Sequence, residues 1–139
     1  MEELGRAAVM DVTFGGGEAF IQKDLSELID AAVQNRMRFA ILSNDGLITP
    51  EIADHIAKTW RCNYVQVSID GSCPETHDRI RGNGSFDAAV RGIKILQKAG
   101  VHVTSGVTIH QYNLDDLENT ARFLLDEIGV NETFMEIKN

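Results

Sequence analysis

The sequence predicts an α/β fold with a parallel sheet, and three observations lead to this class. Hydrophobic residues recur with period two in some segments and with a period near 3.6 in others. The two patterns alternate along the chain, and each change falls at a residue that commonly begins or ends a helix. A strand and a helix recur about every 30 residues, which is the length of a βαβ unit with parallel strands and a right-handed crossover.

In the first half of the chain, the pattern predicts three strands and two helices. Residues 9–14 are the first predicted strand, and residues 39–42 are the second. Between them, Asp24 begins a helix with an apolar stripe, formed by Leu25, Leu28, Ile29, Ala32 and Val33. Thr49 and Pro50 begin the next helix, because threonine is a good N-cap and proline suits the first helical position. Residues 64–69 return to the alternation of a third strand.

The second half adds two helices and two strands. Ser85 begins a helix that ends in a basic last turn at Lys98, followed by the glycine C-cap Gly100. A long strand follows at residues 101–109. Asn113 begins a fourth helix, which ends before a fifth strand at residues 133–137. Five parallel strands and four helices make either part of an eight-stranded (β/α) barrel, which needs about 250 residues, or a small doubly wound sheet.

Composition limits the classes of partner and compartment. With 139 residues, 43% hydrophobic and 24% charged, residues 1–139 are expected to form one globular domain. A net charge of −8 disfavours binding to nucleic acid or to anionic membranes. The sequence has no apolar run of about 18 residues and begins with acidic residues, so a cytoplasmic protein without a membrane segment is expected. Cys62 and Cys73 match no disulfide framework or metal-ligand spacing.

Polar residues follow each predicted strand, where parallel α/β folds place their ligand sites. These loops are residues 15–18, 43–45, 68–71, 110–113 and 136–139. For any one loop, ordinary turn-forming residues are an equally good explanation. Together, the loops predict a site along one rim of the sheet.

The loop Gly15-Gly16-Gly17-Glu18 is the most specific of these signals. Three consecutive glycines cost backbone entropy on folding, so they indicate that a ligand approaches the main chain closely. Phosphate-binding patterns fail, because Phe20 stands where a dinucleotide fingerprint needs glycine or alanine, and Glu18 would repel a phosphate. Bare peptide groups beside a carboxylate suit an ammonium group, such as that of an amino acid.

With these motifs the chain resembles the radical S-adenosylmethionine enzymes. Gly16-Gly17-Glu18 is similar to the Gly-Gly-Glu motif of this family, although Ala19 stands where proline is usual. Residues 42–49 resemble its Thr-Asn-Gly segment, with Asp45 in place of glycine, and residues 67–71 resemble its Ser-x-Asp-Gly segment. Residues 75–86 resemble a sequence that is typical of the branch of the family that modifies peptides and matures sulfatases. The resemblance implies a partial TIM-type barrel made of strands two to six.

The resemblance also implies a set of cofactor-binding residues. Gly16, Gly17 and Glu18 would bind the ammonium of S-adenosylmethionine. Ser43 and Ser68 would reach its ribose or carboxylate, and Arg81 would pair with the carboxylate through its planar fork. Two of these residues have structural alternatives: Ser43 as a loop hydroxyl that bonds its own backbone, and Arg81 as a surface arginine bonded to nearby carbonyls.

Three other residues in these motifs are predicted to be structural. Asp70 is a good turn residue and Asn113 a good cap, so neither receives a catalytic role. His77 is expected to lie solvated in a polar loop.

The family's chemistry depends on a [4Fe-4S] cluster held by three cysteines in a Cys-x3-Cys-x2-Cys loop. This sequence has no such loop, so no catalytic or metal-binding residue is assigned. The resemblance implies a segment of an enzyme that, when intact, generates a 5'-deoxyadenosyl radical and abstracts a hydrogen atom from a peptide or protein. The open edges of a partial barrel also predict self-association.

Two alternatives remain open from the sequence. One is a non-catalytic domain that binds S-adenosylmethionine and has lost the cluster. The other is an unrelated α/β enzyme in which Glu18 or Asp70 is a general base, with Arg79 and Arg81 as a phosphate clamp.

Overall fold

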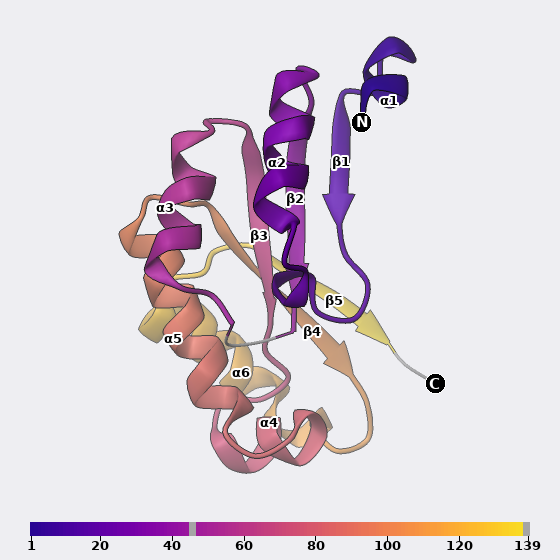
Figure 1. Ribbon diagram of the computed structural model, residues 1–139. Coiled ribbons are helices and arrows are strands. Elements are labelled where there is room, and N and C mark those ends of the chain that lie inside the picture. Colours follow the sequence, from indigo (N-terminus) through magenta and orange to yellow (C-terminus); the bar gives the residue numbers. More distant parts are fainter. Residues whose placement is uncertain (45–46, 138–139) are drawn as a thin grey trace.

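A computed structural model describes residues 1–44 and 47–137. Within these ranges, five parallel strands form one sheet whose order follows the chain (Figure 1). The strands are β1 (Asp11–Phe14), β2 (Arg38–Ser43), β3 (Cys62–Ser68), β4 (Val103–Ile109) and β5 (Thr133–Ile137). Their bounds differ from the predicted ones by at most two residues. The strand order has no reversal, unlike a doubly wound sheet, and the sheet curls, so the partial barrel is confirmed.

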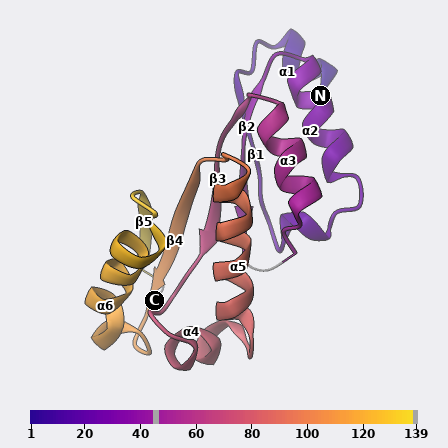
Figure 2. The ribbon, with the colours of Figure 1, turned by 90° about the vertical axis from the view of Figure 1, so that its left-hand side faces the viewer.

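Helices connect successive strands and lie along the outer side of the curled sheet (Figure 2). The four predicted helices correspond to α2 (Leu25–Gln34), α3 (Pro50–Lys58), α5 (Ser85–Lys98) and α6 (Leu117–Arg122). Short 3-10 turns precede two of them, η1 (Ala19–Ile21) before α2 and η2 (Leu114–Asp116) before α6, and a π-helical segment, η3 (Phe123–Ile128), extends α6. Thr49 caps α3 as predicted, with its hydroxyl accepting from the Ile52 amide at 3.4 Å.

Two helices of the described ranges were not predicted. One is the short N-terminal α1 (Glu2–Arg6), and the other is α4 (Pro74–Arg81). The α4 sequence PETHDRIR is too polar to show an apolar stripe, although Pro74 occupies the first helical position. The expectation of a solvated loop at His77 is therefore wrong. Its side chain lies on α4 with no exposed surface and packs edge-on against Phe86.

The core lies between the sheet and its helices. Val65 and Val67 of β3 are fully buried and belong to the same core as Phe39 of β2. Successive residues of a strand point to opposite faces, so Gln66 and Ser68 point to the concave side instead. This alternation leaves the concave side polar, which is where a ligand site can form.

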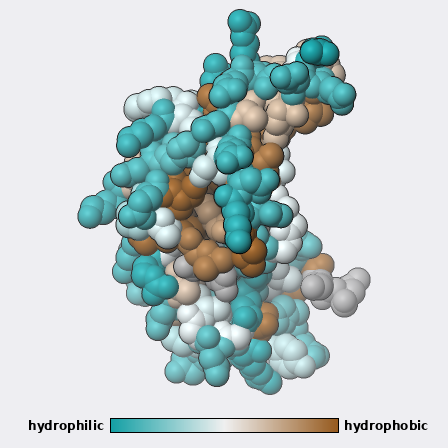
Figure 3. Space-filling model, viewed as in Figure 1, coloured by the Kyte–Doolittle hydropathy of each residue, from teal (hydrophilic) through white to brown (hydrophobic). Residues whose placement is uncertain are grey.

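Apolar surface remains exposed on the molecule. Figure 3 shows it in brown near the middle of the face seen in Figure 1, surrounded by polar side chains. The edge strand β5 also exposes Phe134, Met135 and Ile137, whose exposed fractions are 50%, 55% and 76%. No helix in the described ranges is both long and apolar enough to cross a bilayer.

The carboxylate of Asp78 joins α4 to α5. It accepts hydrogen bonds from the backbone amides of Phe86 at 2.8 Å and Gly84 at 2.7 Å, and from the Ser85 hydroxyl at 3.1 Å. These donors lie at the start of α5, where a helix leaves amides without partners of its own. The amide bonds from Phe86 and Gly84 hold the pKa of Asp78 below its ordinary value of 3.8.

Core packing predicts that substitutions of two aromatic residues change the free energy of unfolding by very different amounts. Phe39 is fully buried, whereas Trp60 is 93% exposed. We expect Phe39→Ala to lower the free energy of unfolding by about 3–5 kcal/mol, because it removes apolar contacts and leaves a cavity. Trp60→Ala, the control, should change it by less than about 0.5 kcal/mol. Urea unfolding monitored by circular dichroism measures both, and equal effects of the two substitutions would contradict this account of the core.

The Asp78 cap predicts a pH dependence of stability. Because its folded-state pKa lies below the unfolded one, its contribution is present above the unfolded pKa and is lost as the pH falls through the folded value. Asp78→Asn should therefore lower stability at neutral pH and reduce the loss of stability as the pH falls below the ordinary aspartate pKa of 3.8. Asp87→Asn, at an exposed carboxylate in the first turn of α5, is the control. Parallel pH profiles for wild type and Asp78→Asn would refute this role.

Candidate functional site

A cavity of about 440 Å³ lies at the carboxyl ends of the strands. Its lining includes residues from β2 to β5, the glycine loop and α4. They are Gly16, Gly17, Leu42, Ser43, Asn44, Gln66, Ser68, Arg81, Gly106, Val107, Thr108, Phe134 and Glu136. Asp45, Gly46, Lys138 and Asn139, which belong to predicted rim segments, lie outside the described residues. The cavity volume falls within the range typical of small-molecule sites.

The glycine loop forms one wall of this cavity. Gly16 has φ +88° and Gly17 has φ +47°, conformations that residues with a Cβ rarely adopt. Both glycines are exposed and line the cavity, and no atom lies within 4 Å of where a Cβ would stand. The glycines are therefore needed for the turn itself, and they leave the backbone open to the cavity.

Glu18 follows the loop, and a set of donors fixes its carboxylate. The Phe20 amide donates at 3.0 Å and the Asn44 amide at 2.5 Å. The Ser43 hydroxyl lies 3.0 and 3.1 Å from the two carboxylate oxygens. The Asn44 side chain also donates to the Gly17 carbonyl. Glu18 is thus held by the end of β2 beside the cavity lining.

The two predicted serines occupy different environments. Ser43 is only 2% exposed, and its hydroxyl bonds both carboxylate oxygens of Glu18. The Ser43 hydroxyl therefore contacts another predicted site residue. Ser68 ends β3, is half-buried and lines the cavity directly.

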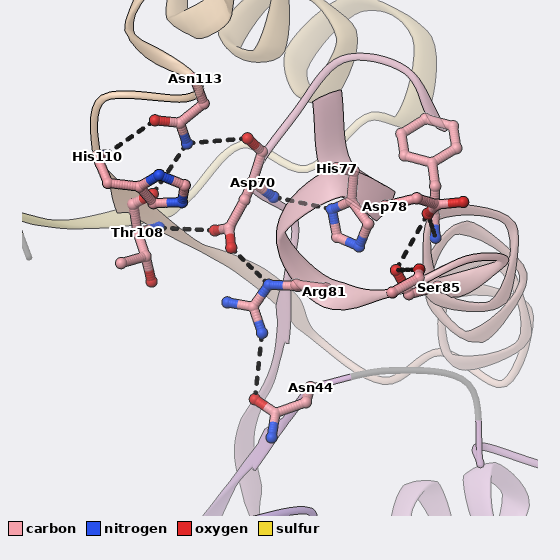
Figure 4. Close-up of polar contacts among 11 residues, drawn as sticks. Asn44, Asp70, His77, Asp78, Arg81, Ser85, Thr108, His110 and Asn113 are labelled. Atoms are coloured by element: carbon pink, nitrogen blue, oxygen red, sulfur yellow. Dashed lines mark hydrogen bonds and ion pairs between the residues drawn. The ribbon is translucent and has the colours of Figure 1, made fainter. Parts of the chain in front are cut away.

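Arg81 ends α4 and lies beside a buried carboxylate (Figure 4). Its Nε donates to Asp70 Oδ2 at 2.5 Å, and one terminal nitrogen donates to the side-chain oxygen of Asn44 at 3.4 Å. The Arg81 side chain is 19% exposed and lines the cavity, whereas the Asp70 side chain is 1% exposed. Arg81 is therefore not a freely solvated surface arginine.

Asn113 contacts the loop after β3 as well as its own turn. Its amide nitrogen donates to the carbonyls of Asp70 and Thr108, both at 2.9 Å, and its oxygen accepts from the His110 amide at 3.0 Å. Asn113 precedes η2, but its side chain makes no capping hydrogen bond to that helix, so the expected cap role is wrong; the side chain joins the loops after β3 and β4 instead. Figure 4 shows Asn113 and Asp70 directly opposite each other.

Asp116 fastens the same two loops at a second point. Burial raises its pKa, but the amide and hydroxyl of Ser72, both at 2.8 Å, and Asn119 donate hydrogen bonds that hold the pKa below its ordinary value of 3.8. An ionised Asp116 therefore fixes the chain immediately before α4, the helix that carries Arg81.

The cysteines do not fit an iron-sulfur cluster of the family type. The sequence has two cysteines where the Cys-x3-Cys-x2-Cys loop needs three. Burial raises the pKa of Cys62 to about 12, so its thiol stays protonated at neutral pH. Cys62 also begins β3, at the end of the sheet opposite the cavity. In the described part of the chain, no group of three metal-ligating side chains is assembled.

Asn44 and Asp70 are site residues to which the sequence motifs assign no part in cofactor binding. Asn44 lies within the segment at residues 42–49 that resembles the family, so the sequence does carry a signal for it. Asp70 follows a strand end, where an aspartate is equally well explained as a turn residue. Only the fold reveals that Asp70 faces Arg81, eleven residues away. Phe134 and Glu136 also line the cavity, from β5.

Comparison with protein families gives a match to the model described as "Radical SAM superfamily", over residues 1–124. Among curated proteins, the chain is similar to the mycofactocin maturase MftC of Mycobacterium tuberculosis, with 39% identity over 122 residues. It is also similar to the Fe-coproporphyrin III synthase of Methanosarcina barkeri, with 41% identity over 124 residues. These alignments cover 87% and 83% of this chain but 31% of each relative.

Solved structures of Streptococcus suis SuiB share the fold. The crystal structure gives a TM-score of 0.84 and covers 99% of this chain and 32% of SuiB, with 15% sequence identity. Complexes of SuiB with S-adenosylmethionine and with the precursor peptide SuiA give TM-scores of 0.81 and 0.79.

The family model covers well over half of the sequence, and its match includes the glycine loop, Glu18 and Arg81. The chain spans about a third of the length of the curated relatives it matches. The protein therefore belongs to the radical SAM superfamily, and its five strands form part of a TIM-type barrel.

Proposed function

We propose that this chain is the S-adenosylmethionine-binding segment of a radical SAM enzyme that modifies a peptide or protein. The observation that carries the proposal is the arrangement of opposite charges around one cavity. Glu18 bonds two residues of its lining, Ser43 and Asn44, and Arg81 lines it from α4. An anion and a cation placed in this way match the ammonium and carboxylate of an amino-acid moiety.

Each predicted residue has a defined part in this proposal. Glu18 and the open backbone of Gly16 and Gly17 receive the ammonium, which donates hydrogen bonds. Arg81 pairs with the carboxylate through N–H groups that Asp70 and Asn44 do not use. Ser68 lines the cavity and can bond the ribose, while Ser43 acts on the cofactor by holding Glu18.

The radical chemistry belongs to the intact enzyme in this proposal. S-Adenosylmethionine and a [4Fe-4S] cluster supply the 5'-deoxyadenosyl radical in this family, and the two cysteines of this chain do not supply the cluster's ligands. Similarity to a maturase and to a protein solved with its precursor peptide supports a peptide substrate, although a porphyrin synthase is also among the relatives. Residues 1–139 serve as one domain, and the free cysteines favour a reducing compartment such as the cytoplasm.

Two other functions are less well supported. A non-catalytic binding domain would use the same cavity, but none of the cavity's residues favours it over an enzyme segment. A general-base enzyme with an Arg79–Arg81 phosphate clamp is excluded by the family membership. The geometry agrees, because Arg79 lies over the Tyr112 ring at 4.6 Å and Asp70 is buried against Arg81.

The ammonium site predicts a selective effect of Glu18→Gln. Losing a charge-assisted contact should weaken S-adenosylmethionine binding by roughly 10- to 100-fold. Binding of 5'-methylthioadenosine, which lacks the amino-acid moiety, should change by less than about twofold, since the lost contact concerns only the ammonium. Isothermal titration calorimetry on the 139-residue chain measures both ligands.

Glu27→Gln is the matched control for this experiment, because Glu27 is an exposed carboxylate on α2. It should leave both affinities unchanged. The proposal fails if the wild-type chain binds neither ligand, or if Glu18→Gln weakens both ligands equally.

The sheet edges predict self-association of the chain. Within the described residues, β1 and β5 are unpaired on one side, and β5 carries exposed Phe134, Met135 and Ile137. We expect a molar mass that rises with concentration in light scattering. Ile137→Lys should reduce the association, because a charge on an edge strand opposes pairing, whereas Trp60→Lys, at an exposed site outside the strands, should not. A monodisperse monomer would contradict this prediction.

A further inference from the structure

Asp70 stands out among the acidic residues of the cavity region because its charge is buried. Its side chain is 1% exposed, and a buried carboxylate is costly unless it is paired and hydrogen-bonded. Both oxygens are engaged: Oδ2 accepts from Arg81 Nε at 2.5 Å, and Oδ1 accepts from the Thr108 amide at 2.8 Å. The carboxylate therefore joins α4 to β4 at the cavity wall.

The backbone of Asp70 is fixed as firmly as its side chain. Its amide donates to Nδ1 of the buried His77 at 3.0 Å, and its carbonyl accepts from Asn113 at 2.9 Å. These partners come from α4 and from the loop after β4, which Figure 4 shows on either side of Asp70. Asp70 thus has little freedom to move relative to either element.

Arg81, by contrast, keeps donors for a ligand. Its guanidinium has five N–H groups, and within the described residues its protein partners are Asp70, at Nε, and Asn44, at one terminal nitrogen. A long arginine side chain loses considerable rotamer entropy when it is ordered. The Asp70 contact imposes that order before a ligand arrives, which lowers the entropic cost of binding.

We propose that Asp70 is a positioning residue that orients the Arg81 guanidinium toward an anionic group of the ligand in the cavity. This inference rests on the proposed function, in which that group is the carboxylate of S-adenosylmethionine. It assigns Asp70 an effect on one part of the ligand only, whereas a purely structural ion pair would affect every ligand of the cavity alike.

The test compares S-adenosylmethionine with decarboxylated S-adenosylmethionine, which keeps the ammonium and lacks the carboxylate. Asp70→Asn is nearly isosteric and keeps an acceptor for the Thr108 amide. It should weaken binding of S-adenosylmethionine by about tenfold or more and binding of the decarboxylated ligand by less than about twofold. Titration calorimetry of the 139-residue chain gives both affinities, and circular dichroism verifies the fold.

Two further variants sharpen this test. Asp116→Asn is the control, since Asp116 also fastens the loop before α4 but bonds Ser72 instead of Arg81. It should alter both affinities in the same proportion. In an Arg81→Ala background, adding Asp70→Asn should cost no further affinity, because the positioned group is already absent.

Each result has a distinct meaning. Equal losses for both ligands, or no loss for either, would overturn the positioning role of Asp70. Binding of neither ligand by the wild-type chain would instead refute the proposed function. Asp70→Glu keeps the charge but displaces Arg81, so it provides the same comparison if Asp70→Asn does not fold.

Discussion

Parallel pairing of the strands in chain order is the constraint on which the site depends. In such a sheet, every strand ends at the same edge, so residues separated widely in sequence meet there. Glu18, Asn44, Asp70 and Thr108 each follow or end a different strand, from β1 to β4. Their contacts, from the Asn44 amide to Glu18 and from the Thr108 amide to Asp70, exist because the strand ends are aligned.

The polar groups at this edge form a continuous series, in which the neutral Asn44 links Glu18 to the ion pair of Arg81 and Asp70. Glu18 is bonded to Asn44, Asn44 to Arg81, and Arg81 to Asp70. In a partly buried setting, each charge is stabilised by its neighbours rather than by water. The same series leaves a carboxylate at one side of the cavity and a guanidinium at another, which is the polarity that a zwitterionic ligand requires.

Helix α4 makes this arrangement possible, although most of its side chains are polar or charged. Its position is fixed by His77 packed against Phe86, by Asp78 at the start of α5 and by Asp116 bonded to the preceding loop. These polar anchors replace the apolar stripe that holds the other helices. They explain how an eight-residue helix whose side chains are mostly charged or polar can hold Arg81 at a defined place.

The sequence by itself determined the fold class, the five strands, four of the helices and the glycine loop. These features depend on local periodicity and on the backbone freedom of glycine, both of which are written in consecutive residues. Only the tertiary structure decided that His77 is buried, that Ser43 bonds Glu18 and that Asp70 faces Arg81. Each of these three facts is a contact between separate elements, and a contact between elements depends on how the sheet curls and where α4 packs, which no local pattern records.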